Sequence, residues 1–194
     1  MPILETSYKS LALKYNSKAR NSNKYILCDF ELTFKCPLRC SHCYSDCYNK
    51  PRFFRNELSF RQIKSILDKL RAEGILWLCF TGGDPLCHPD FKKVYLYARA
   101  SGFFITIFTS GALIDAEMAE VFSKARPFCI EITLNAVTPR TYKVVTGSEK
   151  HLDKVLKGIS LLRALDIPYK IKTMVTKQNR CDLPAMKKFA DSLG

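Results

Sequence analysis

The stretch ILWLCFTGGDPLCHPDFKKVYLYARASGFFITIFT (residues 75–109) contains two short apolar runs separated by a turn and an amphipathic segment. The runs ILWLCF (75–80) and FFITIFT (103–109) are rich in β-branched and aromatic residues, which is typical of buried strands. Between them, four apolar residues at helical spacing form one face of a predicted helix: Phe91, Val94, Tyr95 and Ala98. Two apolar strands joined by a helix predict a right-handed crossover between parallel strands.

The same alternation of strand and helix recurs along the chain. Three further runs have strand character: YILCDFELTF (25–34), FCIEITL (128–134) and YKIKTMVT (169–176). Apolar residues at helical spacing predict four more helices, which begin near Phe60, Met118, Leu152 and Met186. We expect the segment TYKVVTG (141–147) to be a loop. Five strand–helix units with apolar strands predict an α/β fold with a parallel sheet, either doubly wound or curled toward a barrel.

The unusual residues follow the predicted strands, at the edge where parallel α/β folds carry their chemistry. The segments concerned are CPLRCSHC (36–43), TGGDP (81–85), TSG (109–111) and TLN (133–135). We therefore expect all four segments to lie at one edge of the sheet. No glycine-rich phosphate loop follows any strand, so the sequence does not support a dinucleotide or triphosphate site.

Thiols are concentrated in the first of these segments. The chain has nine cysteines, an odd count, and three of them fall within eight residues: Cys36, Cys40 and Cys43. In a reducing compartment such clustering favours metal or redox chemistry over disulfides. With Cys47 or His42 the three could complete a structural zinc site. The spacing differs from the C-x2-C-x2-C-x3-C run of bacterial ferredoxins, whereas three thiolates on a four-iron cluster would leave one iron open to a small ligand.

Length and composition bound the remaining classes. The 194 residues are 47% hydrophobic and 25% charged, which suits one globular core, and we assign it to residues 25–194. Residues 1–24 carry five Lys or Arg and form a basic extension without the apolar run of a signal peptide. Nothing in the sequence is long and apolar enough to span a bilayer. We therefore expect a cytoplasmic protein that does not enter a membrane.

Two motifs together resemble those of the radical S-adenosylmethionine (SAM) superfamily, namely Cys-x3-Cys-x2-Cys after the first strand and Gly-Gly-Asp-Pro after the second. The resemblance covers about residues 25–194 and is strongest to SPASM-type members, which modify peptides or proteins. It implies a parallel partial (β/α) barrel with five of the usual six β/α units, so we expect a barrel core without the C-terminal cysteine-rich region. It also implies that a 4Fe–4S cluster reductively cleaves SAM to a 5′-deoxyadenosyl radical, which abstracts hydrogen from a substrate.

Particular residues take on roles through this resemblance. The implied cluster ligands are Cys36, Cys40 and Cys43. The implied SAM contacts are His42, Gly82, Gly83, Asp84, Pro85, Ser110, Thr133 and Asn135. Among these, the Asp84 carboxylate suits the cationic amine of SAM, and the glycines let backbone carbonyls approach a ligand closely. Taken alone, Gly-Gly-Asp-Pro would be an ordinary turn, and Thr133 and Asn135 would be strand-end caps.

The sequence departs from the family pattern at several of these positions. Ser110 and Asn135 stand where Asn and Asp are usual, and Val144 stands where related sequences often carry an arginine that meets the SAM carboxylate. Lys143 is an imperfect substitute, because an ammonium is a point charge rather than a planar fork. The family needs only three thiols, so we expect Cys47 to lie near the cluster without binding it.

The formal net charge of +13 predicts acidic partners. An acidic reductase such as flavodoxin or ferredoxin is the expected electron donor, and a peptide or protein is the expected substrate. Much of the charge falls on helix faces that are ordinarily solvated. No recognised nucleic-acid motif is present, so an RNA-modifying radical SAM enzyme is a minor alternative. The sequence is also compatible with a zinc- or cluster-binding module without catalysis and with an electron-transfer protein.

Overall fold

The computed structural model describes residues 10, 13, 14, 17, 25–45, 50, 52 and 54–193. Its strands are β1 (Leu27–Thr33), β2 (Trp77–Gly82), β3 (Phe104–Thr109), β4 (Cys129–Thr133) and β5 (Tyr169–Lys172). Its helices are α2 (Phe60–Ala72), α3 (Phe91–Ala100), α4 (Ala116–Lys124), α5 (Pro139–Thr146), α6 (Leu152–Ala164) and α7 (Leu183–Leu193). Most of the predicted basic extension lies outside the described residues, as does Cys47.

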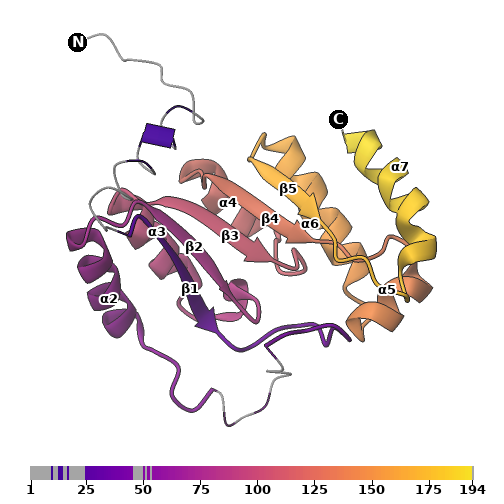
Figure 1. Cartoon of the computed structure of the whole chain (residues 1–194), viewed down its shortest axis with the longest axis horizontal. Helices are drawn as coiled ribbons and strands as arrows, with labels where there is room; N and C mark the ends of the chain where they lie inside the picture. The colour runs from indigo at the N-terminus through magenta and orange to yellow at the C-terminus, as the bar shows by residue number, and fades with distance from the viewer. Residues whose placement is uncertain are drawn as a thin grey trace.

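The five strands form one sheet in the order β1-β2-β3-β4-β5, and every neighbouring pair is parallel. A doubly wound sheet reverses its strand order at a switch point, whereas an uninterrupted order is that of a barrel wall. The α/β class and the parallel sheet predicted from the sequence are therefore confirmed. In Figure 1 the strands fan out as a twisted sheet, with α3, α4 and α6 behind it and α2 at its left edge, beside β1.

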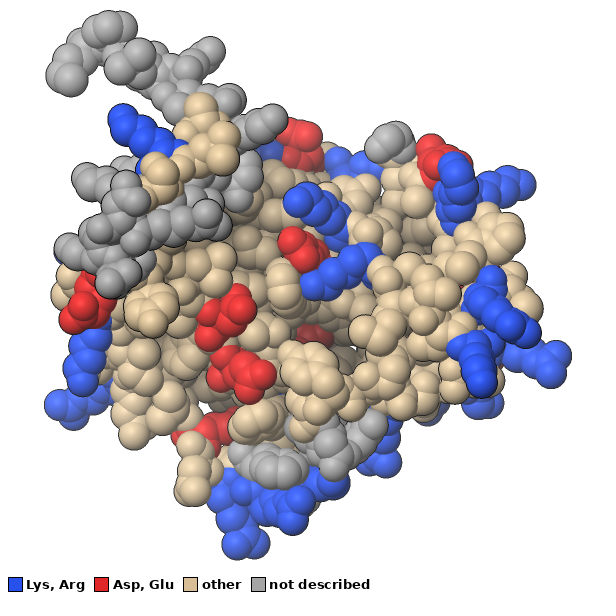
Figure 2. Space-filling view, viewed as in Figure 1, with Lys and Arg blue, Asp and Glu red and all other residues tan. Residues whose placement is uncertain are grey.

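One face of the sheet, here called the uncovered face, carries none of the helices among the described residues. The strand register places Asp29, Glu31 and Glu131 on this face, and Lys172 Nζ lies 3.1 Å from the Glu131 carboxylate. Figure 2 shows acidic and basic side chains side by side in the middle of the face. A cavity of about 400 Å³ opens on the same side at the amino ends of the strands, between Trp77, Cys129 and Tyr169. This cavity thus lies at the opposite end of the strands from the cysteine loop.

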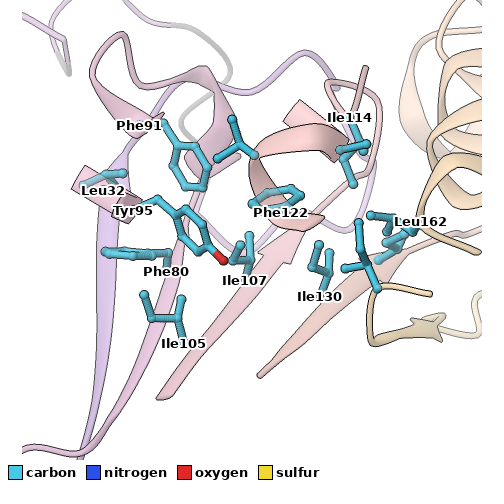
Figure 3. Packing of buried hydrophobic residues seen from close by; sticks show 14 of the residues in the cluster. Leu32, Phe80, Phe91, Tyr95, Ile105, Ile107, Ile114, Phe122, Ile130 and Leu162 are labelled. Atoms are coloured by element: carbon cyan, nitrogen blue, oxygen red, sulfur yellow. The ribbon is translucent and has the colours of Figure 1, made fainter. Parts of the chain in front are cut away.

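The other face carries the hydrophobic core. Side chains from β2, β3 and β4 meet aromatic and aliphatic side chains from α3, α4 and α6, as Figure 3 shows for Phe80, Ile107, Ile130, Tyr95, Phe122 and Leu162. Tyr95 and Phe122 pack edge to face with ring centroids 5.2 Å apart. Alternate strand residues therefore serve different purposes, one set packing on the helices and the other lining the uncovered face.

Local signals explain most element boundaries. Helix α2 begins with the predicted capping box, in which the Ser59 amide donates to Gln62 Oε1 at 2.9 Å. The Asp115 carboxylate accepts from the Met118 amide at 2.8 Å and starts α4. The segment TYKVVTG was expected to be a loop, and this expectation is wrong, because residues 139–146 form α5 and Gly147 ends it in the left-handed conformation.

Candidate functional site

The four segments singled out in the sequence all follow the carboxyl ends of strands. Residues 34–43 follow β1, residues 83–85 follow β2, residues 110–111 follow β3 and Asn135 follows β4. The β1–β2 ladder shifts register between Glu31 and Thr33, just before the cysteine loop begins. Such an irregularity bends a strand and redirects the chain that follows it. The sheet thus brings the predicted site residues to one edge.

Backbone hydrogen bonds fasten the cysteine loop to the end of α5. The Arg39 amide donates to the Thr146 carbonyl at 2.8 Å, and the Ser41 amide donates to the Val145 carbonyl at 2.9 Å. These carbonyls belong to the last turn of a helix, where they have no partner inside the helix. Cys40 lies between the two anchored residues, so α5 determines where its thiol sits.

A second contact holds the beginning of the same loop. Glu57 accepts a hydrogen bond from the Thr33 hydroxyl, and its other oxygen lies 2.8 Å from Lys35 Nζ. Glu57 lies before α2, far from the cysteines in sequence, and no motif marked it as part of the site. The loop is therefore fixed on both sides of Cys36.

Burial raises the pKa of two of the three loop thiols. Burial raises the pKa of Cys36 strongly, and the nearby Asp84 carboxylate raises it further. Burial also raises the pKa of Cys40 to about 11, with a further contribution from Cys43. The third thiol, that of Cys43, lies 3.4 Å from the Ser45 hydroxyl. The three thiols are thus neighbours in a partly dehydrated loop.

Gly82 and Gly83 allow the backbone after β1 to pass very close to β2. A Cβ atom at Gly82 would lie 2.3 Å from the Thr33 carbonyl oxygen, and one at Gly83 would lie 2.4 Å from the Lys35 carbonyl oxygen. The amides of Gly83 and Asp84 donate to these two carbonyls at 2.7 and 2.8 Å. Contact within the chain therefore accounts for both glycines, whereas the sequence suggested the approach of a ligand.

Asp84 is fully buried and its carboxylate is held from several directions. It accepts from the Thr109 hydroxyl at 2.9 Å, from the Ser110 hydroxyl at 2.6 Å and from the Ser110 and Leu86 amides at 3.0 and 3.2 Å. Burial raises the pKa of Asp84, while these hydrogen bonds oppose the rise. In this structure Asp84 and Ser110 thus join the ends of β2 and β3, a role that the motif did not indicate.

Asn135 connects the end of β4 to the cysteine loop. Its Oδ1 accepts from the Met174 amide at 3.1 Å, so its Nδ2 is the atom that faces His42 Nε2, at 3.4 Å. His42 Nε2 must then accept, which assigns the ring hydrogen to Nδ1. Among the described residues Nδ1 is buried and has no hydrogen-bond partner. The ring therefore presents a donor inside the site.

Two further buried residues, Asn179 and Asp182, support this arrangement and were missed in the sequence. Asn179 Nδ2 donates to the carbonyls of Asn135 and Met174 at 2.8 and 2.9 Å, and Asp182 accepts from the Val137 amide at 2.7 Å. Asn and Asp before a helix are ordinary turn and cap residues, and this was the only signal available. Their contacts reach more than forty residues back along the chain.

Replacing Asn179 by alanine should lower the free energy of unfolding by about 2–3 kcal/mol, because buried backbone groups lose their partner. The neighbouring Gln178, which is exposed, is the matched control, and Gln178→Ala should change stability by less than about 0.5 kcal/mol. Urea denaturation of the three apoproteins provides the measurement. Equal stability of the two variants would contradict a supporting role for Asn179.

The remaining candidates are less constrained. Thr133 is half-buried at the end of β4 on the uncovered face, and Pro85 is buried at the start of the 3-10 turn η2 (Pro85–Cys87). Val144 is 57% exposed, on the side of α5 away from buried Tyr142. The Nζ atom of Lys143 lies 3.3 Å from the Glu149 carboxylate. Lys143 is therefore directed to a neighbouring carboxylate.

The structure also bears on zinc binding and on membrane insertion. Within the described ranges, no three His, Cys, Asp or Glu side chains form a group that could hold a single metal ion. The same part of the chain contains no helix of the length and apolar character needed to cross a bilayer. The described residues thus offer no preformed site for one zinc ion.

Comparison with known proteins identifies the family. Residues 30–190 match the family described as the radical SAM superfamily. Fe-coproporphyrin III synthase of Methanosarcina barkeri is 31% identical over 157 residues, covering 81% of this chain and 39% of the relative. PqqA peptide cyclase of Granulibacter bethesdensis is 27% identical over 164 residues, covering 84% of this chain and 43% of the relative.

A solved structure supports the fold. SuiB of Streptococcus suis, bound to its precursor peptide SuiA, superposes with a TM-score of 0.76 at 19% identity, over 98% of this chain and 43% of SuiB. SuiB has also been solved with S-adenosylmethionine bound. The chain spans less than half the length of these similar proteins. The family match and the motifs agree, and the chain belongs to the radical SAM superfamily, a family of enzymes that use a 4Fe–4S cluster and SAM.

Proposed function

We propose that this chain holds a 4Fe–4S cluster through Cys36, Cys40 and Cys43 and cleaves SAM reductively beside it. One observation carries the proposal: three neighbouring thiols sit on a loop that is anchored on both sides, at the edge of the sheet where the other motif residues gather. When bound, the cluster passes one electron from an external reductant to the SAM sulfonium, which releases methionine and a 5′-deoxyadenosyl radical.

The residues present fit such a cofactor. The donor set is three sulfur atoms, which iron–sulfur clusters use, and only three are needed if SAM binds the remaining iron. The site also contains polar atoms that are buried without a partner among the described residues, His42 Nδ1 and the Tyr142 hydroxyl. Buried polar groups are ordinarily satisfied, so such orphans favour a missing ligand.

We assign the SAM contacts to particular atoms of the site. His42, held by Asn135, offers its Nδ1 hydrogen to the adenine side of the ligand. Because Asp84 is already engaged by Thr109 and Ser110, we assign the methionine amine to backbone carbonyls at Gly82 and Gly83. Ser110 and Thr133 flank this position at the ends of β3 and β4, where a ribose would lie, and Pro85 fixes the turn.

The test is reductive cleavage by protein that has been reconstituted anaerobically with iron and sulfide. With dithionite and SAM, wild-type protein should produce 5′-deoxyadenosine, measured by liquid chromatography and mass spectrometry. Asn135→Ala should retain wild-type iron content and cleave SAM about 10- to 100-fold more slowly, because His42 loses its positioning partner. Absence of 5′-deoxyadenosine from iron-loaded wild-type protein would refute the proposed cleavage.

A peptide is the substrate class that we propose for the hydrogen-abstraction step. Similarity to PqqA peptide cyclase and to the peptide-bound SuiB fold supports it. The uncovered face of the sheet adds charged groups that an extended chain could meet, including Glu31 and the Glu131–Lys172 pair. Deuterium transfer from a labelled peptide into 5′-deoxyadenosine would identify a substrate of this class.

Similarity to Fe-coproporphyrin III synthase favours a second candidate, a carboxylate-bearing tetrapyrrole. Fe-coproporphyrin III synthase is the more similar of the two relatives compared, at 31% identity, and the net charge of +13 suits an anionic ligand. Visible absorption titration with an iron porphyrin would reveal it. Tight porphyrin binding without deuterium transfer from peptides would favour this candidate over the first.

An acidic low-potential protein such as flavodoxin or ferredoxin is the electron donor that we propose, in a cytoplasmic setting. The positive net charge would steer an acidic partner toward the chain. Reduction by such a donor should slow markedly between about 50 and 200 mM salt, because screening weakens steering. A rate independent of salt would contradict electrostatic recognition.

A further inference from the structure

Tyr142 is a buried residue next to the cysteine loop that the proposed chemistry does not yet use. Its side chain is 1% exposed, and its hydroxyl makes no hydrogen bond with any described residue. Leaving a hydroxyl unpaired in the interior costs about 1–3 kcal/mol, so such groups are rare in folded proteins. The group therefore requires an explanation.

The position of Tyr142 on α5 places it beside the thiols. Val145 and Thr146, one turn further along α5, accept the backbone hydrogen bonds of Ser41 and Arg39 that enclose Cys40. Residues separated by about one turn share a face of a helix. The electrostatic neighbours of the Tyr142 hydroxyl are, in order of strength, the Cys40 thiol, the Cys36 thiol and the Asp84 carboxylate. The phenol thus lies among groups that are acceptors once the thiols are deprotonated.

Two of the neighbouring acceptors are already engaged. Asp84 receives hydrogen bonds from Thr109, Ser110 and Leu86. The Thr146 hydroxyl, which also lies near the phenol, donates to the Tyr142 main-chain carbonyl at 2.7 Å and accepts from the Ser148 amide at 3.4 Å. The thiolate that forms at Cys40 when a metal binds is therefore the acceptor best placed for the phenol.

We propose that the Tyr142 hydroxyl donates a hydrogen bond to the Cys40 sulfur in the cluster-loaded protein and so makes the cluster easier to reduce. The inference rests on the proposed function, because it requires Cys40 to be a cluster ligand. Hydrogen bonds to cluster sulfurs help set the reduction potential, since a donor stabilises the more negative, reduced state. Tyr142 acts in this way as a positioning and tuning residue, with no contact to the reacting atoms.

The test compares Tyr142→Phe with Tyr95→Phe. Tyr95 is equally buried, but its hydroxyl donates to the Ala125 carbonyl in the core on α3. In reconstituted protein titrated with a one-electron mediator and monitored by electron paramagnetic resonance, Tyr142→Phe should lower the midpoint potential. The ratio of reduced to oxidised cluster at a fixed potential should fall about three- to tenfold, the latter equal to 59 mV for one electron. Tyr95→Phe should leave it unchanged.

A second readout is the stability of the apoprotein. Tyr142→Phe should be at least as resistant to urea as wild type, because no hydrogen bond is lost, whereas Tyr95→Phe should be less resistant. Equal potentials for wild type and Tyr142→Phe would overturn the inference, as would a loss of apoprotein stability in Tyr142→Phe. Weaker SAM binding by Tyr142→Phe at an unchanged midpoint potential would also overturn the inference, because the Tyr142 hydroxyl would then donate to SAM and not to the Cys40 sulfur.

Iron content separates a failure of the proposed function from a failure of the role of Tyr142. If wild-type protein takes up no iron and sulfide, the proposed function and this inference both fail. If both proteins take up equal iron, cleave SAM to 5′-deoxyadenosine and have the same midpoint potential, the proposed function stands and the role of Tyr142 is refuted. If Tyr142→Phe alone loses iron, the hydroxyl serves assembly and not tuning, which equally refutes the inference.

Discussion

Replacing Cys36, Cys40 or Cys43 by alanine should reduce the iron and sulfide retained after anaerobic reconstitution to below about a tenth of the wild-type content. Each thiol would supply one of only three protein ligands, so no spare donor compensates for a loss. Cys181 is exposed and lies in the 3-10 turn η3 (Arg180–Asp182), and Cys181→Ala is the matched control. It should bind as much iron as wild type, as measured by colorimetric iron and sulfide assays.

Cys47 provides the complementary variant. It lies outside the described residues, and the family pattern predicts that Cys47→Ala keeps its iron. An equal loss on Cys47→Ala would indicate a closed site with four thiolates and no open iron for SAM. Purification with zinc in place of iron would reject radical chemistry for this chain.

The second large effect concerns stability. Asp84→Ala should lower the free energy of unfolding of the apoprotein by about 3–5 kcal/mol, because a buried network loses the acceptor shared by its donors. Asp191 forms an exposed ion pair with Lys187 on α7, and Asp191→Ala should cost less than about 1 kcal/mol. Urea denaturation without SAM, under reducing conditions, measures both.

This experiment distinguishes the two roles considered for Asp84. A carboxylate that served only to bind the SAM amine would leave apoprotein stability nearly unchanged when removed. Wild-type stability of Asp84→Ala together with lost SAM affinity would therefore contradict the buried-network role. Lost apoprotein stability with unchanged SAM affinity would indicate that Asp84 of the Gly-Gly-Asp-Pro motif serves to link β2 and β3.

Much of the fold could be predicted from local patterns in the sequence. Four of the five strands lie within about two residues of the expected runs, since apolar β-rich segments are long enough to stand out. The fifth strand is shorter than expected, ending at Lys172 rather than residue 176. The Met174 amide donates to the Asn135 side chain, which takes the chain away from the ladder. That contact spans 39 residues and leaves no local signature.

Helix α5 was not predicted, although residues typical of helix ends stand at both of its boundaries. Pro139 occupies an early helical position and Gly147 follows the end, which is the usual asymmetry of helix termini. The short segment between them is rich in β-branched Val and Thr residues, which have weak helix propensity. Tertiary contacts with the cysteine loop compensate for this weakness. Local propensity therefore pointed the wrong way at the element that anchors the site.

The sequence indicated which segments would gather at this edge of the sheet, but it did not indicate which side chains would contact one another. The motifs brought the cysteines, Asp84, Ser110 and Asn135 to one edge, because parallel strands place their carboxyl ends together. The partners of these residues could not be predicted, since Glu57, Tyr142 and Asn179 reach the site from distant segments. A single sequence carries no information about which distant polar residues meet.

The anchorage of the cysteine loop affects how the site can vary among descendants of this sequence. The backbone bonds from this loop to α5 come from the amides of Arg39 and Ser41, whose side chains are exposed. Natural variation and directed evolution can therefore alter the chemistry around the thiols at residues 39 and 41 while the thiols keep their places. Gly147 is the exception, because a Cβ atom there would lie 3.1 Å from the Arg39 carbonyl oxygen in a left-handed backbone. A mutational scan should find that substitutions at residues 39 and 41 are tolerated and that substitutions at Gly147 are not.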